Sequence, residues 1–247
     1  MLKFFRTIRK KLIEQDNVRK YLLYAIGEIL LVVVGILIAL QVNNWNEQRN
    51  DRKYEATMLN EISLALEQNI SDMENSVKYL NRLQHSIFEL ASIKNDPLHS
   101  RDSLMYHFNE VRGGGIAVSF NASAYEAIKS SGLDKISDPD LRKNLSLLYE
   151  MQLRSVEGWI NEIIRETLLK RSEFVRLTFT IDVRADSSQG IRTEYNELEY
   201  SWLSTHPDFE SFLALSGGYI PRAKSNVEYA ITAMTEVNDQ IKSYLDE

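Results

Sequence analysis

The stretch Tyr21–Val42, YLLYAIGEILLVVVGILIALQV, is the one run in this chain that is both apolar enough and long enough to cross a bilayer. As a helix its 22 residues would extend roughly 33 Å, about the thickness of a hydrocarbon core. Tyr21, Tyr24 and Trp45 lie near its ends, and such amphipathic rings favour the boundary between water and lipid. A buried helix of a soluble protein, the alternative, would not need them there. The stretch therefore predicts a transmembrane helix.

We expect this helix to be a permanent anchor. A cleavable signal has a shorter apolar core and ends in small residues that form an A-x-A-like cleavage site. Residues 38–42, IALQV, contain no such site. The chain should then divide into a cytoplasmic segment (1–20), the transmembrane helix (21–42) and an exported domain (43–247).

The distribution of charge predicts the orientation of the helix. Residues 1–20 contain only two acidic groups, Glu14 and Asp16, whereas positive and negative charges nearly balance beyond Trp45. The positive-inside rule therefore predicts a cytoplasmic N-terminus and, in a bacterial inner membrane, a periplasmic C-terminal domain. The seven basic residues ahead of the span are Lys3, Arg6, Arg9, Lys10, Lys11, Arg19 and Lys20.

The first 13 residues, MLKFFRTIRKKLI, have apolar side chains at helical spacing with basic residues between them. This pattern is typical of a helix that lies on an anionic membrane surface, so we expect the seven basic residues to contact lipid. A cytoplasmic partner is the functional alternative. Anchoring and orientation alone explain the charges more simply.

Composition limits the chemistry of the exported domain. The whole chain carries a formal charge of −6, the first 20 residues contribute +5 and Glu28 contributes −1, so residues 43–247 carry −10. Such an acidic domain is not expected to bind nucleic acid, because binding to phosphates depends on clustered Lys and Arg. The absence of cysteine excludes disulfides and thiolate metal sites.

A long helix should follow the span. No proline occurs between the span and Pro97 and no glycine before Gly113, so the helix is predicted to continue without a break to about Lys94. One apolar stripe with steps of three and four supports this prediction and could form a seam within an antiparallel bundle or with a neighbouring chain. Its members are Leu59, Ile62, Leu66, Ile70, Met73, Val77, Leu80, Leu83, Ile87 and Leu90.

Gly113–Gly115 follow a predicted short helix, residues 100–111. A phosphate-binding loop is rejected, because the lysine and hydroxyl of a P-loop are missing. The glycines are expected to make a sharp reversal at φ values that other residues avoid. Residues 116–120 alternate like a strand, as do residues 177–184, and the two are predicted to pair as a small ribbon.

The remaining segments predict helices. One should end at Gly132, and the next should begin at Asp138-Pro139 and run to about Phe174, with close packing at Gly158. Residues 186–204 read as irregular, a short helix follows Pro207 and ends at Gly217-Gly218, and Pro221 starts the last helix. The predicted buried stripes are Leu141, Leu145, Leu148, Met151, Val156, Trp159, Ile163 and Leu168, and then Val227, Ile231, Met234, Val237, Ile241 and Leu245.

Two segments carry a resemblance to a known family. The opening KYLLYAIGEILLVVVGILIALQVNNWNEQR and the later AYEAIKSSGLDKISDPDLRKNLSLLYE resemble an uncharacterised family of small membrane-anchored proteins that is common in Bacteroidetes-type bacteria. They cover about a third of the chain. The resemblance implies a Gram-negative inner-membrane protein with a helical periplasmic domain, and it supplies no catalytic residues.

The sequence contains no recognisable catalytic, cofactor or metal motif. The four histidines form no HExxH or other short ligand pair, and no G-x-S-x-G elbow is present. Neighbouring acidic residues such as Glu162 and Glu166 are most simply solvated helix faces. We therefore expect no enzyme activity, no cofactor and no metal.

Glu28 is the only carboxylate inside the span. Val32, Gly35 and Ala39 lie on the same helix face, so a second helix could approach closely there and meet the carboxyl group. In the simplest alternative, Glu28 reaches the cytoplasmic headgroups. A proton or ion relay with a multi-span partner is a third possibility.

The sequence as a whole predicts an all-α, single-pass membrane protein. Its exported part should be an elongated antiparallel helical bundle with a minor two-stranded ribbon. The expected function is a self-associating interaction or scaffold protein of the cell envelope, with membrane lipid and either a second copy or another membrane protein as partners. A periplasmic ligand-sensing bundle and an accessory subunit of an ion-driven membrane complex that uses Glu28 remain alternatives.

Overall fold

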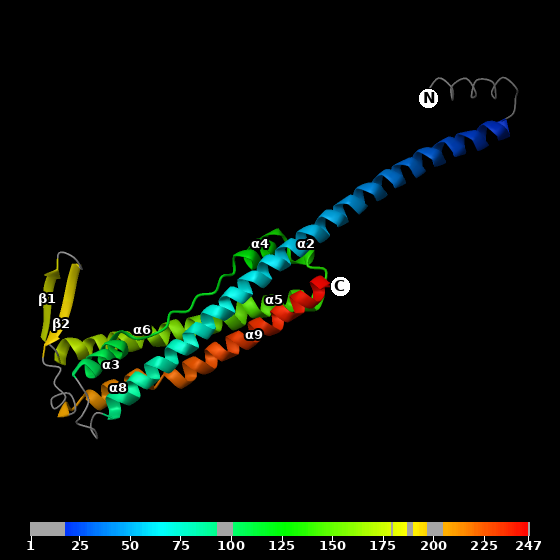
Figure 1. The fold of residues 1–247 in the computed structure, drawn as a ribbon. Coiled ribbons are helices and arrows are strands. Elements are labelled where there is room, and N and C mark those ends of the chain that lie inside the picture. The colour runs from blue at the N-terminus through cyan, green and yellow to red at the C-terminus, as the bar shows by residue number, and fades with distance from the viewer. Residues whose placement is uncertain (1–17, 93–100, 179, 187–189, 197–204, 247) are drawn as a thin grey trace. The chain divides into compact units, whose positions relative to one another are not determined.

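The computed structural model describes residues 18–92, 101–178, 180–186, 190–196 and 205–246 (Figure 1). The chain divides into two compact units, Met1–Ala56 and Thr57–Glu247. The described part of the first unit is helical, and the second is a helical bundle with one hairpin. The predicted all-α class is confirmed. The predicted amphipathic segment at residues 1–13 lies outside the described residues.

Helix α2 (Val18–Ser92) runs without a break through the predicted span and through the apolar stripe that follows it. This agrees with the prediction of a continuous helix to about residue 94. The helix contains an 18-residue window with a mean hydropathy of 2.5, none of it buried. Within the described part of the chain, α2 is thus the one helix long and apolar enough to cross a membrane.

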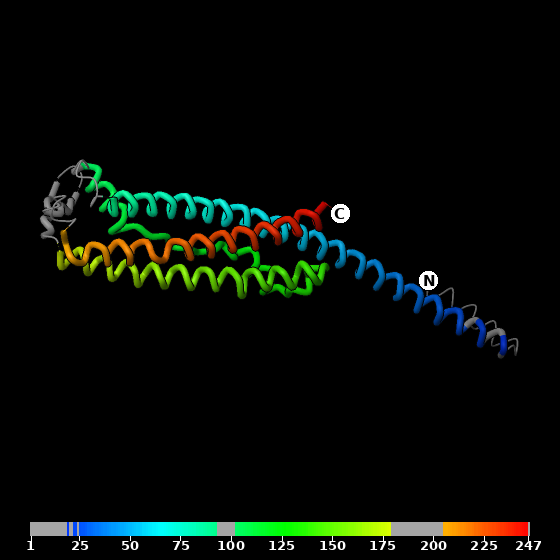
Figure 2. The backbone as a smooth tube through the Cα atoms, turned by 90° about the horizontal axis from the view of Figure 1, so that it is seen from below, coloured from blue at the N-terminus to red at the C-terminus, as the bar shows by residue number. Residues whose placement is uncertain are grey.

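Three long helical segments form the bundle of the second unit: residues 57–92 of α2, the run from α5 (Pro139–Leu147) through η2 (Leu148–Gln152) to α6 (Leu153–Thr178), and α9 (Ile220–Asp246). They lie side by side in two views (Figures 1 and 2). Helix α9 is antiparallel to both partners, because its residues contact them in reverse order. Two such contacts join Ser63 to Asn238 at 2.6 Å and Gln84 to Lys224 at 2.5 Å.

The predicted stripes of α2 and α9 are confirmed as the core. Leu59, Ile62, Leu66, Leu80 and Leu83 are fully buried, and Ile70, Val77 and Ile87 are half-buried. On α9 Val227, Met234, Val237 and Ile241 are buried, whereas Ile231 and Leu245 are half-buried. Helices with this spacing are stabilised mainly by burial of one apolar face, so the three segments require each other.

The predicted stripe along α5 and α6 is only partly right after Leu148, where Val156 is buried as predicted but the other members are not. Met151 is 65% exposed, and Trp159, Ile163 and Leu168 are only half-buried. The cause is η2, a single π-helical turn, which uses one extra residue and rotates the rest of the helix. The buried face continues instead through Leu153, Val156, Ile160, Ile164, Thr167, Arg171 and Val175.

The predicted strand at residues 116–120 is also wrong. Residues 114–122 have no regular secondary structure; Ile116 and Val118 are buried in alternation, but the segment pairs with no strand among the described residues. Two side-chain amide groups form the backbone hydrogen bonds that a partner strand would otherwise form. Asn161 accepts from the Val118 N–H at 2.9 Å and donates to its carbonyl at 2.7 Å. Asn69 accepts from the Asn121 N–H at 2.9 Å and donates to the Asn121 carbonyl at 3.2 Å. Residues 114–122 are therefore tied to both α6 and α2, and this segment is called the strap.

The second half of the predicted ribbon has a different partner. Helix α6 continues to Thr178, and strand β1 (Thr180–Asp186) pairs antiparallel with β2 (Gly190–Asn196), in register from Thr180–Asn196 to Asp186–Gly190. Strand β2 falls in a segment expected to be irregular. Closing the short loop to a neighbouring hairpin strand costs far less entropy than closing the long loop to residues 116–120, which explains why β1 pairs with β2.

The short helices of the second unit are α3 (Arg101–Gly113), α4 (Ser123–Ser131), η1 (Leu133–Lys135) and α8 (Phe209–Gly217). Their predicted ends are confirmed within a few residues. Gly132, with φ 110°, ends α4, and the Asp138 carboxylate accepts from the N–H groups of Asp140 and Leu141 at the start of α5. Close packing at Gly158 is not found, because a Cβ there would meet nothing within 4 Å.

Candidate functional site

The four residues expected to contact a second helix in the membrane lie on one face of α2. At 100° per residue Val32, Gly35 and Ala39 fall within about 40° of Glu28 around the helix axis. Val32 and Ala39 are exposed, and a Cβ at Gly35 would meet nothing within 4 Å. Glu28 is half-buried and takes part in an interaction within the chain. This face therefore offers space for a neighbouring helix beside Gly35.

The residues expected at the membrane surface are mostly outside the described part of the chain. This applies to Lys3, Arg6, Arg9, Lys10 and Lys11. Arg19 and Lys20 belong to the first turn of α2, and Arg19 is exposed.

A buried arginine joins α6 to the end of α3. Arg171 is 0% exposed, and its two terminal nitrogens donate hydrogen bonds to the main-chain carbonyl oxygens of Val111 and Gly114. Val111 belongs to the last turn of α3, where the carbonyl groups carry partial negative charge. Within the described residues Arg171 forms no ion pair with a carboxylate. Its charge is instead compensated by the end of a helix.

Two tyrosines complete the surroundings of Arg171. The Tyr79 hydroxyl accepts from the Gly115 N–H at 3.3 Å, and Tyr219 is 7% exposed. Burial lowers the pKa of Arg171, and burial raises the pKa of Tyr219 against the opposing effect of the guanidinium. The Arg171 Nε and the Tyr219 hydroxyl have no hydrogen-bond partner among the described residues. The two side chains nonetheless act on each other's pKa, so Tyr219 lies close to the guanidinium.

The glycines after α3 act through close approach, and the prediction of an unusual φ is wrong. Among the described glycines only Gly132 has a positive φ. A Cβ at Gly114 would lie 2.3 Å from the Glu110 carbonyl oxygen and 2.7 Å from Leu83 Cδ1. A Cβ at Gly115 would lie 2.9 Å from Ile164 Cγ2. The missing side chains thus allow the loop to pass between α2 and α6.

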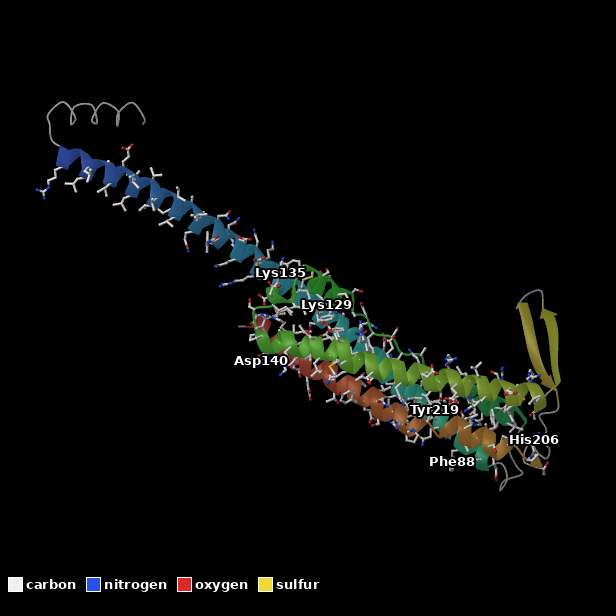
Figure 3. The ribbon with its side chains drawn as sticks, turned by 180° about the vertical axis from the view of Figure 1, so that it is seen from behind. Phe88, Lys129, Lys135, Asp140, His206 and Tyr219 are labelled. Carbon is white, nitrogen blue, oxygen red and sulfur yellow. The ribbon has the colours of Figure 1, made fainter. Side chains whose placement is uncertain are left out.

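The π-turn brings a second cluster of polar groups to α4. The rings of Tyr125 and Tyr149 stack with centroids 4.5 Å apart and planes 9° apart. The Tyr125 hydroxyl donates to Glu150 Oε1 at 2.7 Å, and Lys129 Nζ lies 3.0 Å from the same oxygen. Lys129 lies at the same end of the unit as Lys135 and Asp140, whereas His206 and Phe88 lie at the other (Figure 3).

The electrostatics of this cluster favour a structural role. The hydrogen bond from Tyr125 and then the nearby Lys129 lower the pKa of Glu150. Burial, followed by the hydrogen bond to Glu150, raises the pKa of Tyr125 to about 12, and burial also raises the pKa of Tyr149. A phenol that holds its proton so firmly is a poor base at neutral pH. The cluster ties α4 to the π-turn.

The described histidines, His85, His107 and His206, are not arranged as a metal site. His85 and His107 meet edge to face with centroids 5.8 Å apart, and His107 Nδ1 lies 3.0 Å from Ser86 Oγ. His206 accepts from the Asp208 N–H at 3.2 Å, and His99 lies outside the described residues. In the described part of the chain, no group of three or more His, Asp or Glu residues could hold a metal ion.

A hollow of about 440 Å³ lies between the start of α5 and the end of α9. Carboxylates, a lysine and amides line it, so its chemistry suits a small polar molecule. The lining residues are Asp138, Asp140, Leu141, Lys143, Asn144, Gln240, Ser243 and Tyr244. Asp138 already caps α5, and Asn144 donates to Gln240 at 2.8 Å.

Sequence reasoning did not find the Arg171 cluster or the strap. Arg171 appears in the sequence as one of several basic residues on a predicted helix, and Asn69 and Asn161 appear as ordinary polar positions. One signal was available, because Asn69 and Arg171 both lie at positions that continue a buried stripe. A polar residue on such a stripe requires a buried partner.

Comparison with known families gives one result. A family of unknown function (DUF6090) matches residues 28–155, just over half of the 247 residues. The matched region contains the Glu28 face, the strap and the Tyr125–Glu150 cluster. No curated protein and no solved structure matches the chain.

Proposed function

The chain belongs to this family, DUF6090, and we propose from its site geometry that it is a membrane-anchored interaction or scaffold protein of the cell envelope that associates with itself. The observation that carries the proposal is the contrast along α2. Leu22, Leu23 and the apolar residues from 26 to 42 are exposed, with none of the most apolar window buried, whereas the apolar stripe from Leu59 to Leu90 is buried or half-buried in a bundle. A contiguous apolar surface of this kind is stable only against lipid or protein.

The face around Glu28 supports association within the membrane. A carboxyl group inside a span is costly when it faces lipid and favours a protein neighbour. Gly35 has space beside it, so a second copy of α2 could approach closely enough to contact Glu28. A cytoplasmic N-terminus and a periplasmic bundle follow from the charge distribution, and lipid contact by the seven basic residues is part of the same proposal.

The location is tested with a reporter that is active only in the periplasm. Fused after Glu247 and expressed in a Gram-negative host, it should be active because the basic flank retains the N-terminus in the cytoplasm. The matched control carries the same reporter before Met1 and should be silent. Activity of the second fusion alone would reverse the proposed orientation and remove the periplasmic assignment.

Association is tested by energy transfer between donor- and acceptor-labelled full-length chains in phosphatidylcholine vesicles. Glu28→Leu and Gly35→Leu should each reduce transfer several-fold, because the first removes the polar contact and the second fills the space for the neighbouring helix. Glu28→Gln should retain transfer, since it keeps a hydrogen-bonding group. Gly27→Leu is the matched control. A Cβ at Gly27 would also meet nothing within 4 Å, but Gly27 lies about 100° around the helix from Glu28. Equal transfer in all variants would exclude this face as the interface.

Two alternatives keep some support. The hollow at α5 and α9 would suit a ligand-sensing bundle, and Glu28 would suit an accessory subunit of an ion-driven complex. The first would require ligand-dependent change at Asp140 or Lys143. The second would require ion flux through a partner that depends on Glu28, even when association is unchanged.

A further inference from the structure

Four side chains form a shallow hollow of about 270 Å³ on α2 just after the apolar stretch. They are Trp45, Gln48, Arg49 and Arg52, spaced by three and four residues, so they share one face of the helix. All four are exposed. Neither arginine forms a hydrogen bond or an ion pair with any other described residue.

The charges of this segment nearly cancel along the sequence but are separated around the helix. At 100° per residue, Gln48, Arg49 and Arg52 lie within about 60° of Trp45, whereas Glu47 and Asp51 lie at least about 120° away. The third acid, Glu55, is 3% exposed. The Trp45 face therefore presents two positive charges beside an aromatic ring.

Only one of the two arginines has an acidic neighbour at helical spacing. A basic residue on a helix gains support from an acid three or four residues away. None of the four residues at these positions around Arg49 is acidic, whereas Arg52 has Glu55 three residues further on. Arg49 therefore gains no such support.

The direction and reach of these side chains bring them to the membrane surface. Side chains on an α-helix tilt toward its N-terminus, which here is the apolar stretch. Trp45, Arg49 and Arg52 begin about 5, 11 and 15 Å beyond Val42 at the helical rise per residue. The headgroup layer extends roughly 5–8 Å beyond the hydrocarbon core. Long arginine stems cover the remaining distance.

We infer that the face formed by Trp45, Gln48, Arg49 and Arg52 binds phospholipid headgroups of the leaflet on the C-terminal side of the span, with preference for anionic lipid. The indole would occupy the boundary between headgroups and hydrocarbon, and the guanidinium groups would pair with phosphate oxygens through parallel hydrogen bonds. The inference rests on the proposed membrane anchor and names the lipid that this side of the anchor contacts.

The test uses the full chain in phosphatidylcholine vesicles that contain a small fraction of dansyl-labelled phosphatidylglycerol or dansyl-labelled phosphatidylcholine. Energy transfer from Trp45 is obtained by subtracting the signal of Trp45→Phe. Transfer to the anionic probe should exceed transfer to the neutral one, with about fivefold local enrichment for each arginine. The double variant Arg49→Gln/Arg52→Gln should abolish the preference. Arg154→Gln/Arg176→Gln, which changes the charge equally on exposed positions of α6, should retain it.

Each other outcome is decisive. Equal transfer to both probes, or equal loss in the control variant, overturns the inference. Excess inorganic phosphate should leave the preference for the anionic probe unchanged. If phosphate abolished this preference, the site would be assigned to free phosphate instead of lipid. Vesicle flotation separates the two proposals: a chain that fails to float contradicts the membrane anchor, whereas a chain that floats without preferring anionic lipid contradicts only this inference.

Discussion

Replacing Arg171 by methionine is expected to lower the free energy of unfolding by about 3 kcal/mol, because the carbonyl oxygens of Val111 and Gly114 would stay buried without their donors. Methionine fills much of the volume, so the loss reports the hydrogen bonds and the charge at the end of α3. Urea unfolding of the full chain in detergent, followed by far-UV circular dichroism, measures it.

Arg176→Met is the matched control for this change. Arg176 is exposed on the same helix, so its replacement should alter the free energy of unfolding by less than about 0.5 kcal/mol. Arg171→Lys keeps the charge but has no second planar donor, and an intermediate loss is expected. If Arg171→Met unfolded no more easily than Arg176→Met, the arginine would not hold the end of α3.

Two glycine-to-alanine changes are expected to have opposite signs. Gly114→Ala should lower the free energy of unfolding by about 3 kcal/mol, since the new methyl group overlaps the Glu110 carbonyl oxygen and Leu83, and the loop must move. Movement of this loop would also displace the Gly114 carbonyl from Arg171. The measurement is the same urea unfolding.

Gly158→Ala serves as the control, because Gly158 is exposed inside α6 with nothing within 4 Å of a Cβ. Alanine loses less backbone entropy in a helix, so this variant should gain about 0.5–1 kcal/mol. A higher free energy of unfolding in both variants would mean that the loop after α3 accommodates a side chain. A lower free energy of unfolding in both would mean that Gly158 packs against a neighbouring group.

Local signals account for the parts of the fold that the sequence predicts well. Asp138 caps a helix that begins with Pro139, and Gly132 ends one, because these residue types satisfy helix ends wherever they occur. The length of α2 follows in the same way from the lack of breakers. Of the candidate sites, the sequence predicts the helix face of Glu28 but neither the Arg171 cluster nor the Trp45 face.

Some of the errors occur where a residue's partner is distant. Residues 116–120 have the alternation of a strand, and the structure keeps that alternation of burial. However, the amides of Asn69 and Asn161 satisfy the backbone, so no strand pairing forms. The π-turn at Leu148–Gln152 similarly moves the buried face by one residue. No pattern in a single sequence specifies either choice.

The sequence by itself determined that this protein has one long apolar stretch, an uninterrupted helix through it and a helical domain after it. These features depend on composition, periodicity and chain breakers, which act over a few residues. The tertiary structure decided which side chains satisfy the buried backbone, why Gly114 must lack a side chain, and that Arg171 compensates the end of α3. Those outcomes depend on contacts between residues from 31 positions apart (Gly114 and Leu83) to 60 positions apart (Val111 and Arg171), whose distances only the packed bundle sets.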